Sequence, residues 1–343
     1  MTSCELPRIQ ISDPGELIET VPYLLGFHPR QSLVLIGFAG GADSPGPQQV
    51  RVSVRLDLPD PLSGGFDDEA LLPLGDVLRR ADCQAMAALL VTDPVAGDPR
   101  ADGGLLACRD LLAAAMATAG IDILDMLVVT DQRWWSLCCE QPDCCPSAGH
   151  QRVLGCSAAA AQATFAGLVA LPDRQAMLAT LAGRGAEQRS ALLPRLAEAE
   201  RRKAAGPPER AVRRRLAEVA GLLAAAERGP APLSDEQLAA HAVALTDLRV
   251  RDALWLAIDD GSVTAGLLMA ELHARLPAPY DAAPLFLYGW SQWRAGNATL
   301  AMMAAERALA SQPGYSAAAL LVTAAQRGLD PRTVPALSQG RSA

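Results

Sequence analysis

Aromatic residues are scarce in this sequence: Phe, Trp and Tyr together make up 4% of its 343 residues. Half of the residues are nevertheless apolar, and Ala, Leu and Val dominate among them. Such side chains suit closely packed helices better than an aromatic-rich β-sandwich. The composition therefore favours a helix-rich protein. The chain is longer than one hydrophobic core usually organises, so we expect two domains.

Catalytic and nucleotide-binding signatures are also missing from the sequence. No G-x4-G-K-[ST] phosphate loop is present, and no G-x-G-x-x-G dinucleotide loop follows a predicted strand. Ser136 lacks the G-x-S-x-G turn that presents a nucleophilic serine. These absences leave nucleoside triphosphatase, dinucleotide-dependent and serine hydrolase functions without support.

The sequence lacks a secretory signal and a membrane-spanning run. Residues 1–7 contain no basic stretch followed by an apolar one. The most apolar long stretch, residues 105–129, is interrupted by one arginine and three aspartates, whose charges are costly in lipid. We therefore expect a cytoplasmic protein with no membrane partner. In that compartment its eight cysteines are expected to be reduced thiols or metal ligands and not a disulfide framework.

Net positive charge is absent as well, since the formal charge at pH 7 is -8. A chain of this charge repels phosphate backbones, so we expect no nucleic-acid partner. One local run is basic, with glutamates interleaved, and its cations are Arg195, Arg201, Arg202, Lys203, Arg210, Arg213, Arg214 and Arg215. We interpret this run as a solvated helix face, with an anionic-ligand or RNA surface as the alternative.

Hydrophobic patterning in residues 1–175 predicts an α/β domain with a mixed sheet. Runs with the length and pattern of strands lie at 32–38, 50–56, 86–91 and 124–130. The Gly- and Pro-rich stretch 40–47 between the first two runs predicts a hairpin. A helix over 105–119 separates the last two runs, which makes that pair of strands parallel. Two further helices are predicted, one beginning at Pro14 and one over about 69–80.

After the cysteine segment the chain predicts helices without a convincing strand, and the second domain is expected to cover residues 176–343. The expected helices cover about 157–168, 173–183, 187–204, 209–228, a segment starting at 235, 251–258, 264–275, 284–294, 298–311 and 315–327. We therefore expect an α/β domain followed by an all-helical domain.

The helical pair at about 284–313 resembles a tetratricopeptide repeat. Small residues at Gly289, Ala301, Ala305 and Ala308 let two helices approach closely, while Leu285, Tyr288 and Leu309 fill the groove between them. Stacked pairs of this kind form concave surfaces that bind peptides. The sequence thus predicts a protein partner for the helical domain and a non-catalytic interaction or regulatory function.

Residues 133–149 concentrate four of the eight cysteines and two of the five tryptophans. Cys139, Cys144 and Cys145, with His150 and Cys156 nearby, offer soft ligands for zinc, although the adjacent pair is not a standard C-x2-C element. Redox pairing of Cys139 with either neighbour is a second interpretation. A third is that small apolar thiols simply pack against a tryptophan ring.

Polar residues at the ends of predicted strands suggest an alternative function, an enzyme or small-ligand sensor. The candidate ligand-binding residues are His28, Arg55, Asp57, Arg133 and Ser136. Open α/β sheets bind ligands at strand ends, and histidine titrates near neutral pH. We therefore expect these side chains to line a polar cleft if the α/β domain has a site.

Several segments resemble an uncharacterised, mainly actinobacterial family, the domain of unknown function 4192. The resemblance rests on residues 21–29, 32–34, 55–59, 133–136, Cys139, 144–146, Gly149, Gly167, Arg174 and 293–313. It covers nearly the whole chain and implies relatives of the same fold in a bacterial cytoplasm, but no activity and no catalytic residue. Cys138 stands where the family often has an aromatic residue, and His150 belongs to no family motif, which weakens it as a metal ligand.

Overall fold

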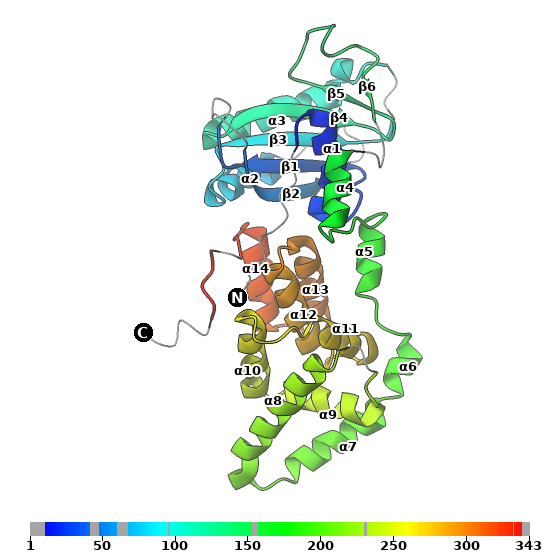
Figure 1. The fold of residues 1–343 in the computed structure, drawn as a ribbon, viewed down its shortest axis with the longest axis vertical. Coiled ribbons are helices and arrows are strands. Elements are labelled where there is room, and N and C mark those ends of the chain that lie inside the picture. The colour runs from blue at the N-terminus through cyan, green and yellow to red at the C-terminus, as the bar shows by residue number, and fades with distance from the viewer. Residues whose placement is uncertain are drawn as a thin grey trace. The chain divides into compact units, whose positions relative to one another are not determined.

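The computed structural model describes residues 11–41, 48–59, 68–94, 97–152, 157–229, 232–331 and 333–337. Contacts divide the chain into two compact units, Met1–Ala176 and Met177–Ala343. The first contains a six-stranded mixed sheet with helices, and the second contains helices (Figure 1). The predicted order, an α/β fold followed by helices, is confirmed. Among the described helices, none combines the length and apolarity needed to cross a membrane.

The sheet has the strand order β2-β1-β3-β4-β5-β6. Its strands are β1 (Ser32–Phe38), β2 (Val50–Asp57), β3 (Ala85–Val91), β4 (Asp122–Val129), β5 (Arg133–Ser136) and β6 (His150–Gln151). The β1–β2 pair is antiparallel and the β3–β4 pair is parallel, as the sequence predicted. Two short strands, β5 and β6, flank the cysteine segment and were not predicted.

Helices cover both faces of this sheet. They are α1 (Pro14–Leu25), α2 (Asp68–Arg80), α3 (Gly103–Ala119) and α4 (Ala158–Phe165). Leucines of α2 and α3 join Leu33, Leu35 and Val128 of the sheet in one apolar core. Side chains alternate along a strand, so Val34 and Leu127 are buried on the opposite face, where α1 and α4 pack against each other.

Several strands meet at one edge of the sheet. The parallel strands β3 and β4 both end there, with Val91 in register with Val129. Ser32, the first residue of β1, pairs with Val91 on one side and with Asp57, the last residue of β2, on the other. The loops that follow β3 and β4 therefore emerge side by side, where α/β sheets commonly bind ligands.

The described residues of the second unit form helices joined by loops. Its helices are α5 (Arg174–Thr180), which begins in the first unit, α6 (Ala186–Ser190), α7 (Leu193–Ala204), α8 (Ala211–Glu227), α9 (Asp235–Leu245), α10 (Leu248–Asp259), α11 (Gly266–Arg275), α12 (Ala282–Arg294), α13 (Ala298–Ser311) and α14 (Ser316–Gln326). The single helix predicted over 187–204 is wrong, because the chain breaks it into α6 and α7. Pro194 lies in the first turn of α7, where its missing N–H costs nothing. Inside one continuous helix it would remove a backbone hydrogen bond and crowd the preceding turn.

Helices α12 and α13 pack as closely as their small residues predict. A Cβ atom at Gly289 would lie 3.0 Å from the carbonyl oxygen of Ala301. Leu285, Ala305 and Ala308 are buried between the helices and their neighbours. Small side chains therefore set the distance between the two helices, and aliphatic and aromatic side chains fill the core around them.

Candidate functional site

The first half of the cysteine site is a turn that Ser136 holds in place at the end of β5. The Ser136 hydroxyl donates to Oδ1 of Asp125 at 2.6 Å and accepts the backbone N–H groups of Cys138 and Cys139, each at 3.1 Å. Burial raises the pKa of Asp125, and the hydrogen bond from Ser136 opposes that rise. Ser136, expected to line a ligand cleft, instead positions Cys139.

The second half of the site is the turn that carries Cys144 and Cys145. Both of their backbone N–H groups donate to the carbonyl oxygen of Gln141, at 3.1 and 2.6 Å. Arg100 donates to the carbonyl oxygen of Cys145 at 2.9 Å and forms an ion pair with Asp98 at 2.7 Å. Two separate chain segments thus fix the turn from both sides.

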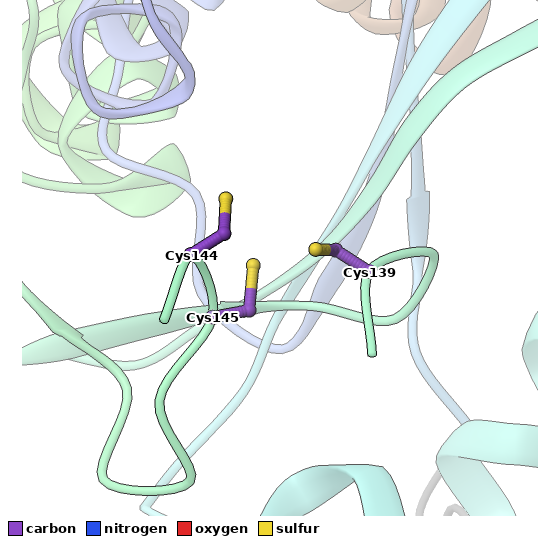
Figure 2. Close-up of side chains that lie close together, drawn as sticks. All are labelled: Cys139, Cys144 and Cys145. Carbon is purple, nitrogen blue, oxygen red and sulfur yellow. The ribbon is translucent and has the colours of Figure 1, made fainter. Parts of the chain in front are cut away.

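These two turns direct three sulfur atoms toward one another (Figure 2). The Sγ atoms of Cys139, Cys144 and Cys145 all lie within 4.8 Å of one another. Cys145 is buried, Cys139 is half-buried and Cys144 is exposed. The adjacent cysteines, which seemed unfavourable for shared ligation, therefore present both sulfurs to the same point.

Of the two neighbours considered from the sequence, His150 lies apart from the three thiols. The imidazole ring of His150 stacks on Trp134, with ring centroids 4.1 Å apart and planes 19° from parallel. It is not part of the sulfur group, and no fourth His, Cys, Asp or Glu among the described residues joins that group. Cys156 lies outside the described residues.

The three thiols are electrostatically unequal. A hydrogen bond from the backbone N–H of Gln141, followed by hydrogen bonds from the thiols of Cys145 and Cys144, lowers the pKa of Cys139. Burial, followed by hydrogen bonding to Cys139, raises the pKa of Cys145 to about 12. Cys139 therefore ionises before Cys145, and it is only half-buried.

The loop after Cys145 is fastened to β5. Trp135 donates from Nε1 to the carbonyl oxygen of Ser147 at 3.0 Å. Arg133 donates to the carbonyl oxygens of Ala148 and Gly149 at 2.8 and 3.2 Å. Gly149 has a φ of +74°, and a Cβ there would lie 2.4 Å from the Trp135 ring. Only glycine lets the loop cross this indole so closely.

A pocket of about 710 Å³ adjoins this loop at the carboxyl ends of β3 and β4. Its walls include Asp98, Thr130, Asp131, Arg133, Trp135 and Ser147. The volume falls in the range of small-molecule sites. Asp98 and Asp131 were not singled out from the sequence, although each follows one of the two parallel strands, and that placement was the signal available to find them.

The five predicted ligand-binding residues do not form one cluster. Arg55 pairs with Asp57 on β2 and donates to the Ser32 hydroxyl at 2.8 Å. Arg133 lies on β5, four strands from β2 in the sheet, and lines the pocket. Burial lowers the pKa of His28, and the carboxylate of Glu19 opposes this shift. Of the five residues, Arg133 alone lines the pocket and Ser136 alone holds a cysteine turn.

Comparisons with known proteins return a family but no function. The family described as Domain of unknown function (DUF4192) matches residues 14–332. No curated protein and no solved structure gives a significant match. The match agrees with the resemblance that the sequence motifs carry.

Proposed function

We propose that this chain, which belongs to the family described as Domain of unknown function (DUF4192), binds a soft metal ion through Cys139, Cys144 and Cys145. Zn²⁺ is the ion that we expect first. The observation that carries the proposal is the convergence of three sulfurs within 4.8 Å. The protein is on this view a non-catalytic regulatory protein whose α/β unit holds the metal.

The distances support the proposal because little movement would complete the site. Zn–S bonds of about 2.3 Å at tetrahedral angles place the sulfurs about 3.8 Å apart. The thiols therefore need to close by no more than about 1 Å. Thiolates are also the ligands that select Zn²⁺ and Cu⁺ over Mg²⁺ and Ca²⁺.

Within the part of the chain that the structure describes, the set has three sulfurs, and three protein ligands favour an exchangeable ion over a purely structural one. Structural zinc sites are closed by four protein ligands, whereas sites with three protein ligands keep a position for water or another ligand. Cys144 is exposed, which gives an ion a path from solvent. Such a site fits a protein that responds to metal supply.

Metal analysis of the full chain, purified under reducing conditions, tests the proposal. We expect about one equivalent of Zn²⁺ after loading and desalting, and a Co²⁺ derivative with sulfur-to-metal charge-transfer absorption. Replacing Cys139, Cys144 or Cys145 with serine should remove most of the bound metal. Cys138→Ser is the matched control, because Cys138 is exposed and outside the group. Less than about a tenth of an equivalent in the wild-type chain would reject the metal site.

Thiol–disulfide exchange is a second candidate, favoured by the lowered pKa of the accessible Cys139. The Cys139 thiolate attacks a disulfide such as oxidised glutathione and displaces one glutathione thiolate. The thiol of Cys144 or Cys145, once deprotonated, then attacks the mixed disulfide and releases the second. Mass spectrometry of the oxidised chain should find Cys139 joined to one of these two cysteines. Recovery of glutathione adducts alone would reject this function.

The helical unit supports a separate proposal, the binding of a protein partner. Its support is the close α12–α13 packing that a tetratricopeptide-like pair requires. A small ligand in the strand-end pocket, contacting Arg133, remains the alternative proposal for the α/β unit. A cytoplasmic location fits both metal and redox functions, because reducing conditions keep the thiols available.

A further inference from the structure

The solvent face of α8 (Ala211–Glu227) is apolar, the reverse of what a surface helix normally presents. Seven of its residues are exposed, and five of these are apolar: Val212, Leu216, Ala217, Ala220 and Ala224. Val212 and Leu216 expose 65% and 67% of their surface. The charged pair Arg214–Glu218, 3.8 Å apart, is half-buried instead. Single exposed leucines are normal on a protein surface, but an apolar stripe several turns long calls for an explanation.

The exposed stripe is self-complementary about Ala220. Arg213 and Glu227 are the two exposed charges of α8, and they lie seven residues before and seven residues after Ala220. Leu216 and Ala224 lie four residues before and four after it. The large Leu216 thus has the small Ala224 as its counterpart across the centre, and the positive Arg213 has the negative Glu227.

From this symmetry we infer that two copies of the chain associate through α8, antiparallel, about a two-fold axis at Ala220. In this arrangement Leu216 packs against Ala224 of the partner subunit, and Arg213 pairs with Glu227 of the partner subunit. An interface about a two-fold axis uses the same patch on both copies, so the patch must be self-complementary. Alanines along its centre let the two helix axes approach closely.

Exposed leucines lie beside both ends of the stripe. At the Val212 end, Arg215 of α8 binds Asp247 at 2.6 Å, which places Leu248 beside the helix. At the other end Leu267 and Arg228 line a hollow of about 440 Å³. An antiparallel pairing brings the Leu248 end of one copy to the Leu267 end of the other. These contacts extend an interface that one helix pair alone would leave below the usual size of about 1,600 Å².

Sedimentation velocity of the full chain tests the inference, which is independent of the metal proposal. We expect a reversible monomer–dimer equilibrium starting from the 35.9 kDa monomer, with a dissociation constant on the order of 10 µM for an interface of modest area. Leu216→Glu and Ala220→Glu should each weaken association at least about tenfold, because they place charges in the apolar centre. Leu320→Glu is the control, since Leu320 is equally exposed (64%) but lies on α14.

Charge reversal supplies a test that a folding defect cannot imitate. Arg213→Glu and Glu227→Arg should each weaken the dimer, and the double variant should restore it, because the reversed pair forms again across the two-fold axis. Circular dichroism checks that every variant keeps its helix content. A chain that stays monomeric up to about 200 µM would overturn the inference. A dimer that Ala220→Glu leaves intact would also overturn it.

Discussion

Replacing Gly149 with alanine should destabilise the α/β unit more than the same replacement at Gly120, another turn of this unit. Gly149 has a φ of +74°, and its position against the Trp135 ring leaves no room for a Cβ, whose nearest ring atom would be 2.4 Å away. The same ring donates the hydrogen bond that holds Ser147. The substitution therefore disturbs backbone, packing and loop together.

The expected cost has two parts that can be separated. A left-handed backbone costs a residue with a Cβ about 1–2 kcal/mol relative to glycine. Forcing the Trp135 ring aside adds about 1–3 kcal/mol, as overpacking usually does. Gly120 also has a positive φ, +69°, but a Cβ there meets nothing within 4 Å. Gly120→Ala should therefore show the backbone cost alone, and Gly149→Ala about 2–5 kcal/mol.

Native-state hydrogen exchange of the full chain measures the stability difference between the two variants in the α/β unit alone. Amide protons in the buried strands β3 and β4 report the free energy of unfolding of the sheet, whereas whole-chain melting mixes two units. A change in protection at β3 and β4 that is equal for Gly149→Ala and Gly120→Ala would refute the close contact with Trp135. A change confined to residues 133–151 would mean that the loop opens without unfolding the sheet, contrary to this expectation.

Three further variants probe the cores and their charges. Gly289→Val should destabilise the helical unit by about 2–3 kcal/mol, measured by hydrogen exchange of buried amides in α12 and α13, because Cβ contacts begin at 3.0 Å. Gly221→Ala, where the nearest atom is 3.8 Å away, should be stabilising by up to about 1 kcal/mol. Burial lowers the pKa of His273 from 6.5 to about 4, so the unfolded chain binds the proton first. The stability of the helical unit should fall by about 3 kcal/mol as pH drops from 6.5 toward 4. His273→Leu should flatten that slope when hydrogen exchange of buried amides in α11 and α12 is followed across this pH range. Arg152→Leu leaves the negative charge of the Glu19 carboxylate, 3.0 Å from Arg152 in the native chain, buried without a positive partner. We expect the α/β unit to lose about 3–5 kcal/mol of stability, measured by hydrogen exchange at β3 and β4, and a smaller loss when Glu19 is replaced with leucine as well.

Short-range patterning was enough to predict most of the sheet. The run 32–38 became β1 with the predicted bounds, and the strand at 50–56 was extended by Asp57 alone. These strands are buried or alternate cleanly, so local hydrophobicity determines them. By contrast, β5 and β6 contain four and two residues, too few for any period to be visible. Tertiary pairing with β4 makes them strands, and no local signal carries that information.

The sequence predicted which cysteines form the candidate site, but not how they come together. The density of cysteines identified Cys139, Cys144 and Cys145 without a structure. Their convergence depends on Ser136 and Gln141, whose hydrogen bonds to the backbone fold the two turns toward each other. Such bonds join residues two to four positions apart through geometry that the sequence does not specify. His150 belongs to no family motif, which weakened it as a ligand at the level of sequence, and its stacking on Trp134 separates it from the thiols in the structure.

The basic run of the helical unit is largely solvated, as the sequence predicted, because five of its eight cations are exposed; part of α8 is the exception. The sequence-based interpretation of residues 195–215 as a solvated charged face assumed that arginines turn to water. In α8, Arg214 and Arg215 are half-buried and bound to Glu218 and Asp247, while Leu216 is exposed. Packing of α8 against its neighbours decides which side faces solvent, because Leu222 and Ala225 must enter the core. The apolar stripe left outside is therefore a consequence of the fold, and a second copy of the same stripe is the surface that matches it in both size and charge.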